Sequence, residues 1–329
     1  MLITLTTITL TVLAGCNGIT GAKKPLSTES TLLTVDFQRG LTLRYKFVSH
    51  RDIELDWGPT KSGPKSDKNR VAKSSEAMEM VVAYTPIEVD PYGLTTIKAT
   101  CKSVKVRRIP RKSRRKDAVK NITGKTFTFT VSPTGKIEDC SQLEALICEI
   151  GEKAFQPDSK RGKIKEPDMI DDFIATQWFL WDSVSSIEKP AEGVSVGQTW
   201  NSKLPVPNPM VIRKARDVTY TLGEIRQTEK GQLAVIHSSY SPSESILRTW
   251  PNPYSGAGMF RMSGTFGFLR GYKVLDLQGH GEELFNIDAG RTEQYNQQYQ
   301  VQMEAFLPLP VSVNPRITIK QKISMQLLE

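Results

Sequence analysis

The sequence contains few of the residues and patterns from which catalytic, metal or cofactor sites are recognised. Its 329 residues include only three histidines, His50, His237 and His280. No CxxC pair, phosphate-binding glycine loop or GxSxG nucleophile motif occurs. His280 lies in "GHGEE" beside Glu282 and Glu283, but its flanking glycines favour a solvated turn, because a metal site needs three or four convergent ligands. We therefore expect no catalytic residues, no metal site and no cofactor.

Long hydrophobic runs are also scarce, and a membrane-spanning helix needs about 20 apolar residues. Residues 2–14 form a shorter uncharged run, rich in Leu, Ile, Val and Thr, whose length is typical of the apolar core of an export signal. The motif LAGC that follows, ending at Cys16, resembles the bacterial lipobox. This resemblance implies that residues 1–15 are a signal peptide and that Cys16 carries lipid. The alternative is an N-terminal strand, suggested by alternating threonines, that leads to a buried Cys16.

The residues after Cys16 indicate where the protein is located. Residues 16–35 are mostly polar and contain Gly, Ser and Thr, which predicts a flexible tether between the lipid and a folded body. Asn17 in place of Asp favours the outer membrane under the sorting rule of enteric bacteria. We therefore expect an exported protein that is lipid-anchored in the cell envelope, with the outer membrane favoured over the inner membrane.

The net charge of +9 comes from one segment, because residues 102–120 contain ten Lys and Arg against one Asp. This segment connects two predicted strands, and one interpretation is a solvated loop. The other is binding of anionic lipid head groups, since each basic residue near a charged membrane contributes about 1 kcal/mol. Nucleic acid is disfavoured as a partner, because the segment has no aromatic residues for base stacking. The candidate surface within residues 107–120 consists of Arg107, Arg108, Arg111, Lys112, Arg114, Arg115 and Lys116.

Much of the remaining sequence alternates between apolar and polar residues, which is typical of strands with one buried and one solvated face. The clearest examples are residues 41–47, 78–84, 97–102 and 317–327. Short glycine-containing turns, such as residues 133–135 and 288–290, separate such segments. The pattern predicts antiparallel rather than parallel sheets.

Two segments show helical spacing instead. In the first, Ser141 and Glu144 have the form of a capping box, and apolar residues follow at helical intervals. The second, residues 167–188, predicts a largely buried helix. Its expected apolar face contains Ile170, Phe173, Ile174, Trp178, Trp181 and Val184. Its expected polar face contains Asp171, Asp172, Asp182 and Ser183.

The cysteines leave the disulfide question open. The first helix separates Cys140 from Cys148 by roughly 10 Å or more at 1.5 Å per residue, which is too far for a disulfide. Any disulfide then involves Cys101, and the alternative is three buried, reduced thiols.

Together these elements predict an α+β fold that is predominantly antiparallel β. The segments "FTVSPTGKI" at 129–137 and "FNIDAGRT" at 285–292 share a strand–turn–strand pattern, and each follows a pair of alternating strands. This suggests two related curved-sheet lobes with two amphipathic helices between them. The expected parts are a β-rich lobe ending in a helix at 36–160, a connecting buried helix at 161–192 and an antiparallel β lobe at 193–329.

The pieces together resemble a bacterial family of two-lobed, β-rich envelope lipoproteins of uncharacterised function. The resemblance rests on the LAGC motif and on the strand–turn–strand segments near 127–138 and 284–303. It implies a location and a shape, and it supplies no catalytic residues.

We expect a non-enzymatic binding or scaffolding role for a lipid-anchored envelope protein. Two alternatives stay open, namely a carrier that holds an apolar ligand or lipid in a β-sheet cavity, and an envelope hydrolase whose site forms only in three dimensions. The expected partners are the membrane, through the N-terminal lipid, and an unknown envelope protein or apolar ligand. The loop at 249–264 either covers a sheet edge or forms a binding surface through Trp250, Tyr254 and Phe260.

Overall fold

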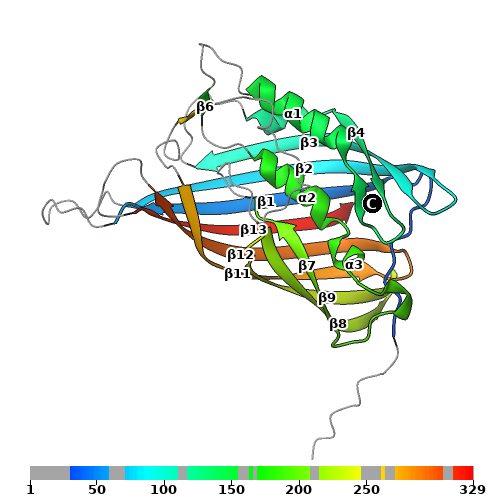
Figure 1. Ribbon diagram of the computed structural model, residues 1–329. Coiled ribbons are helices and arrows are strands. Elements are labelled where there is room, and N and C mark those ends of the chain that lie inside the picture. The colour runs from blue at the N-terminus through cyan, green and yellow to red at the C-terminus, as the bar shows by residue number, and fades with distance from the viewer. Residues whose placement is uncertain are drawn as a thin grey trace, which may run out of the picture.

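The computed structural model describes residues 30–58, 71–109, 117–154, 163–165, 169–207, 215–245, 261–263, 271–306 and 314–328. Most of these residues belong to one curved, 11-stranded antiparallel sheet, and the helices pack on one of its faces (Figure 1). We call the face under the helices the inner face and the opposite one the open face. No helix in the described ranges is long and apolar enough to cross a membrane.

Each half of the chain contributes a contiguous half of the sheet. The first half contains β1 (Leu43–Asp56), β2 (Val71–Val89), β3 (Thr95–Ile109), β4 (Thr126–Val131) and β5 (Ile137–Asp139). The second half contains β7 (Thr199–Pro205), β8 (Ala215–Thr228), β9 (Gly231–Pro242), β11 (Gly271–Asn286), β12 (Arg291–Phe306) and β13 (Arg316–Leu328). The strand order is β5-β4-β3-β2-β1-β13-β12-β11-β9-β8-β7. Two short strands, β6 (Lys163–Lys165) and β10 (Arg261–Ser263), pair separately and in parallel.

The predicted antiparallel β class is confirmed, whereas the expected division into two lobes differs from what is observed. The pairing of β1 with β13 joins the two halves along the whole length of both strands, from Arg44 opposite Leu328 to Asp56 opposite Arg316. Because this ladder of hydrogen bonds is continuous, the halves share one sheet instead of forming separate bodies. Both turn segments at 129–137 and 285–292 do connect neighbouring antiparallel strands.

Alternation of apolar and polar residues gives the sheet its two different faces. The predicted alternation in β1, β2, β3 and β13 is confirmed over most of its length, because thirteen inward side chains are at most 3% exposed, whereas Leu41, predicted on the buried side, is 43% exposed. The thirteen are Tyr45, Phe47, Met78, Met80, Val82, Tyr84, Ile97, Ala99, Cys101, Ile317, Ile319, Ile323 and Met325. They form a single apolar core with the helices.

Helix α1 (Ser141–Ala154) begins where the sequence predicts it and packs on β4 and on the 3-10 helix η2 (Ala118–Ile122). Its predicted apolar positions, including Leu143 and Ile147, are buried. Its first turn differs from a capping box, because the Asp139 carboxylate accepts hydrogen bonds from the Ser141 N–H at 3.0 Å and from Ser141 Oγ at 3.2 Å.

The helix predicted over residues 167–188 is two helices, α2 (Ile170–Phe179) and α3 (Asp182–Ser185), followed by the 3-10 helix η3 (Pro190–Glu192). The break falls at Trp181, whose φ of −134° and ψ of 11° leave the helical region. The Trp181 ring packs 5.4 Å from the Phe37 ring and 6.0 Å from the Phe129 ring, measured between centroids. Aromatic packing at this position therefore decides where the helix ends.

Asp172, predicted on the polar face of this helix, lies in the core. It is fully buried, and its carboxylate accepts hydrogen bonds from Arg51 Nη1 at 2.7 Å and from Ser49 Oγ at 2.6 Å. Gln321 of β13 donates to the same carboxylate. The expectation of a largely buried helix is met in α2, where only Asp171 and Trp178 are half-buried, and the sheet supplies the polar partners that Asp172 needs.

The packed body also begins earlier than composition suggests. Thr31 forms an isolated bridge with Val194, and Leu33 is 1% exposed. Part of the polar segment 16–35 that predicts a tether is therefore held against the sheet.

Candidate binding site

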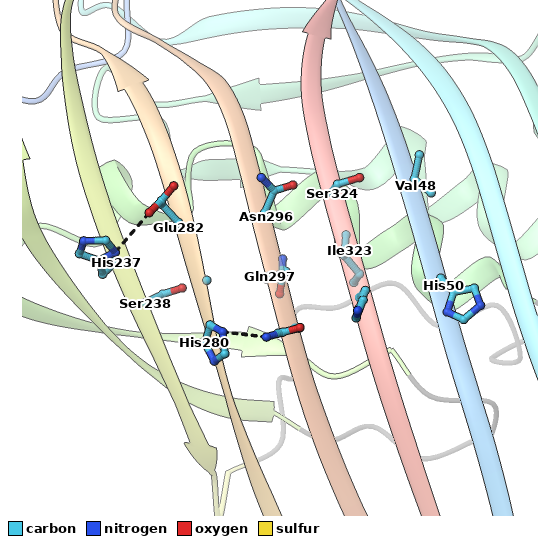
Figure 2. Close-up of a pocket in the computed structure, with 13 residues that line it drawn as sticks. Val48, His50, His237, Ser238, His280, Glu282, Asn296, Gln297, Ile323 and Ser324 are labelled. Atoms are coloured by element: carbon cyan, nitrogen blue, oxygen red, sulfur yellow. Dashed lines mark hydrogen bonds and ion pairs between the residues drawn. The ribbon is translucent and has the colours of Figure 1, made fainter. Parts of the chain in front are cut away.

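The open face carries a groove of about 590 Å³ that crosses β9, β11, β12, β13 and β1 (Figure 2). We call it the open-face groove. It is lined by Val48, His50, His237, Ser238, His280, Gly281, Glu282, Asn296, Gln297, Gln298, Lys322, Ile323 and Ser324. All three histidines of the chain belong to it.

Strand register arranges the outward side chains of the groove in two neighbouring rows. The first row, from β1 to β11, contains His50, Lys322, Gln298 and His280. The second row, from β1 to β9, contains Val48, Ser324, Asn296, Glu282 and His237. Figure 2 shows both rows running across the strands. The side chains are therefore fixed by rigid strands, and successive members of each row are direct cross-strand neighbours.

A second hollow of about 620 Å³ extends the groove along the same strands. It shares His50, His280, Gln298 and Lys322 with the open-face groove and adds amide side chains of Gln278 and Gln300. The two hollows thus adjoin across the centre of the open face.

Imidazole, amide and ammonium groups supply the hydrogen-bonding chemistry of the groove, whose lining surface is otherwise mostly apolar. His280 Nε2 lies 2.8 Å from Gln298 Nε2, and His237 Nδ1 lies 3.9 Å from a Glu282 carboxylate oxygen. Lys322 has no ion-pair partner among the residues that the structure describes. Such groups donate and accept hydrogen bonds, which suits the binding of a polar partner.

The three histidines do not form a metal site in the described ranges, where no group of three or more His, Cys, Asp or Glu could hold an ion. Two strands, β12 and β13, separate His50 from His280, so their imidazoles cannot converge on one point. The sequence by itself does not predict these groove residues as a site. One feature of the sequence indicates that they face solvent, namely their position on the polar side of alternating segments.

The prediction that "GHGEE" is a turn is wrong, because these residues lie in the middle of β11. Gly279 and Gly281 occupy inward positions, and a Cβ on Gly281 would lie 2.6 Å from Tyr240 Oη. Each glycine is therefore needed because neighbouring strands fill the space beside it, with Tyr240 at Gly281 and the Gln298 carbonyl and Tyr299 at Gly279. Glu282 is exposed, whereas Glu283 is buried on the inner face.

Two carboxyl groups, buried Glu283 and half-buried Asp182, lie between the inner face and the helices. Burial raises the pKa of Glu283 to about 7, and Thr292 Oγ1 donates a hydrogen bond to its carboxylate at 2.6 Å. Desolvation likewise raises the pKa of Asp182 to about 6, although hydrogen bonds from Tyr220 and Ser202 and the charge of Arg216 oppose the shift. Glu283 is enclosed, Asp182 lines a separate hollow, and neither belongs to the open-face groove.

None of the cysteines that the structure describes lines the groove. Cys101 is buried, Cys140 and Cys148 are half-buried, and none of the three forms a disulfide. Burial raises the pKa of the Cys101 and Cys140 thiols to about 11, which leaves them protonated and weakly nucleophilic near neutral pH.

The candidate basic surface is only partly within the described residues. Arg107 is exposed near the end of β3. Arg108 pairs instead with Glu76 and with Asp117, whose carboxylate lies 2.8 Å from Arg108 Nη2. Arg108 is therefore held in an internal ion-pair network. The other members, Arg111, Lys112, Arg114, Arg115 and Lys116, lie outside the described residues, as do Cys16, Trp250, Tyr254 and Phe260.

Comparison with known proteins gives one sequence family and a remote structural likeness. No curated protein matches the sequence. The lipovitellin chain from a structure titled "Lipid-protein interactions in lipovitellin" aligns with a TM-score of 0.46 and 9% identity, over 89% of this chain and 26% of that one. The chain thus spans about a quarter of that protein's length. Residues 82–239 match the model of a family of unknown function (DUF6263), so the sequence is similar to a family whose role is not known.

Proposed function

We propose that this protein is a non-enzymatic binding protein of the cell envelope, anchored by lipid on Cys16, that contacts a polar envelope partner through the open-face groove. The observation that carries this proposal is the gathering of all three histidines, with Lys322 and amide side chains, on one face of the sheet. These side chains come from five strands, so only the folded sheet assembles them.

The surroundings of the groove favour recognition by side chains rather than by backbone. The groove strands are paired on both sides, so their N–H and C=O groups are already used in the ladder. A partner must therefore be bound by the imidazole, amide and ammonium groups that project from the face. Their hydrogen-bonding capacity fits a polar surface, and the balance of Lys322 with Glu282 disfavours a purely electrostatic interaction.

The N-terminal segment supports placement close to a membrane. A flexible chain of the length and composition of residues 17–30 spans roughly 20 Å root-mean-square. Lipid on Cys16 would hold the sheet within this distance of the bilayer, close to envelope components. Intact-mass measurement of the membrane-extracted protein is expected to show a chain that begins at Cys16 with added acyl mass, and an unmodified Met1 terminus would contradict the anchor.

Binding to envelope material tests the groove directly. The full chain carrying Cys16→Ser, which cannot be lipidated there, is mixed with envelope fragments from the source cells and sedimented. We expect His280→Ser/Lys322→Ser in this background to weaken binding at least about tenfold, because each change removes a partner-facing hydrogen-bonding group. The control is Lys98→Ser/Lys102→Ser, which removes two exposed lysines of β3 outside the groove.

Two results would contradict the proposed function. One is that the Cys16→Ser protein with an intact groove does not sediment with the fragments. The other is that the groove and control variants bind equally well. Circular dichroism and the urea midpoint of each variant show whether the comparison is made between folded proteins.

A further inference from the structure

One strand of the open face carries a column of amide side chains. On β12 five successive outward positions alternate with buried inward residues, and each outward position holds an amide. The five are Gln294, Asn296, Gln298, Gln300 and Gln302. At about 3.4 Å per residue, the column is about 27 Å long. We call it the amide column.

The amide column runs through both hollows of the open face. Asn296 and Gln298 line the open-face groove, and Gln298 and Gln300 line the second hollow. Because Gln298 belongs to both, the hollows follow one another along β12. Figure 2 shows Asn296 between its cross-strand neighbours, Glu282 of β11 and Ser324 of β13. An extended ligand that lies along β12 therefore meets several amides in succession.

The hydrogen-bonding groups of the column are available to such a ligand. Gln298 Nε2 lies 2.8 Å from His280 Nε2, whereas the side chains of Asn296 and Gln300 make no hydrogen bond within the described part of the chain. Each amide offers two N–H donors and one carbonyl acceptor. A ligand that displaces water from the column must therefore present both donors and acceptors.

The charges beside the amide column are balanced. The lysines that line the two hollows are Lys320 and Lys322, and the carboxylates that line them are Glu282 and Asp52. With neutral imidazoles, two cations thus face two anions. A polyanion gains little from such a surface, because its attraction to the lysines is offset by repulsion from the carboxylates. This balance favours an uncharged ligand.

The lining also disfavours a folded protein as the ligand. The binding energy of protein interfaces is concentrated in Trp, Tyr and Arg side chains that fill pockets. Among the residues that the structure describes, no Phe, Trp, Tyr or Arg lines the open-face groove, and Tyr240 and Tyr299 at the second hollow are buried. The groove instead has a mostly apolar lining with polar groups at intervals. This combination is typical of sites for small organic molecules, and it suits the C–H faces and polar groups of a sugar chain.

We propose that the amide column binds a linear polysaccharide of the cell envelope, whose hydroxyl or acetamido groups exchange hydrogen bonds with Asn296, Gln298 and Gln300. The inference rests on the proposed function, because it names the polar partner of the open-face groove. A side-chain amide donates to one oxygen of a sugar and accepts from a neighbouring O–H or N–H, so each amide engages the chain in both directions. Lys320 and Lys322 donate further hydrogen bonds beside the column.

Calorimetric titration with oligosaccharides of defined length tests the inference on the full chain carrying Cys16→Ser. The probes are β-1,4-linked oligomers of glucose and of N-acetylglucosamine, each with two, four and six sugars. We expect at least one series to bind, with an affinity that rises at least about tenfold from the shortest to the longest oligomer, because a longer chain reaches more amides. The tighter series shows whether hydroxyl or acetamido groups are recognised.

Two variants assign this binding to the amide column. Gln298→Ala/Gln300→Ala removes two successive amides and should weaken binding of the longest oligomer at least about tenfold. The matched control is Gln227→Ala/Gln232→Ala, which removes an exposed cross-strand pair of amides from β8 and β9, outside both hollows. The control should bind as the Cys16→Ser protein does. Equal urea midpoints show that the two variants are equally well folded.

Envelope fragments separate the polysaccharide from other partners. Fragments from the source cells are digested with protease and extracted with detergent, which removes proteins and lipids and leaves polysaccharide. Sedimentation of the Cys16→Ser protein with these fragments should be unchanged. Loss of sedimentation after protease digestion would overturn the inference and would identify a protein as the partner of the groove.

The inference is also overturned if neither oligosaccharide series binds, if affinity does not rise with length, or if the amide variant binds as tightly as its control. In each of these cases the proposed function still stands when untreated fragments sediment with the protein and His280→Ser/Lys322→Ser releases it. Failure of the polysaccharide and failure of the groove are therefore distinguishable.

Discussion

Glu283 makes the stability of the fold depend on pH. Its side chain is 1% exposed on the inner face of β11, and burial raises its pKa from 4.5 to about 7. In the unfolded chain the same carboxyl group is solvated and titrates near its ordinary value. The folded protein therefore retains a proton on Glu283 over a pH range in which the unfolded chain loses it.

The sign of the effect follows from this difference in bound protons. A carboxyl group whose pKa is higher in the folded state favours folding most at pH values below its unfolded pKa, and this stability is lost as the pH rises through the folded value. The interval between 4.5 and about 7 corresponds to about 3 kcal/mol at 1.36 kcal/mol for each pH unit. The free energy of unfolding should therefore fall between about pH 4.5 and pH 7. Asp182 acts in the same direction, because its pKa is raised to about 6.

Glu283→Gln removes the ionisation and keeps an oxygen that can accept the hydrogen bond from Thr292. We expect the variant to be more stable than the unmodified protein by about 3 kcal/mol near pH 8, and the difference to shrink toward pH 4.5. Urea unfolding followed by tryptophan fluorescence at a series of pH values measures this. The matched control is Glu282→Gln, at the adjacent and exposed position of the same strand, which should not change the pH profile. A difference between Glu283→Gln and the unmodified protein that stays constant with pH would refute the reasoning.

Three further substitutions test other parts of the structure. Asp172→Asn is expected to cost about 3–5 kcal/mol of stability in urea unfolding, because it leaves the buried Arg51 charge without its closest partner; a loss below about 1 kcal/mol would contradict this. Gly281→Ala should lower the free energy of unfolding by about 1–3 kcal/mol, because the added Cβ would meet the Tyr240 hydroxyl, and an unchanged urea midpoint would show that the strand accommodates it. Arg108→Gln should lower the melting temperature and leave binding to anionic vesicles unchanged, because its guanidinium is held by two carboxylates; weaker vesicle binding at normal stability would show the opposite.

Much of the fold could be predicted from local pattern. Residues 78–84 and 317–327 alternate so regularly that both the strand type and the buried face follow from the sequence. The apolar spacing after Ser141 predicts α1 with the correct start. The expectation of two lobes differs from the structure because nothing local specifies that β1 pairs with β13.

The candidate sites could not be predicted in the same way. His50 and His237 lie at polar positions of alternating segments, which indicates that they face solvent, but their assembly in one groove depends on the order of strands that are far apart in the sequence. The glycines beside His280 indicated a turn from the sequence alone. In the structure, Gly281 is needed because the Tyr240 side chain of the neighbouring strand leaves no room for a Cβ. The sequence places Asp172 on a polar helix face but does not show its buried ion pair, because Arg51 lies on a strand that is distant in the sequence.

The sequence by itself determined the strand-rich class, the buried side of several strands, the start of α1 and the location of the excess charge. These properties depend on side-chain period and composition, which neighbouring residues set locally. Only the tertiary structure decided that the sheet is continuous, that buried Arg51 is neutralised by Asp172 and Glu76, and that three histidines share one groove. Such features depend on the pairing of distant strands, and pairing is fixed by the packing of the whole core rather than by any single segment.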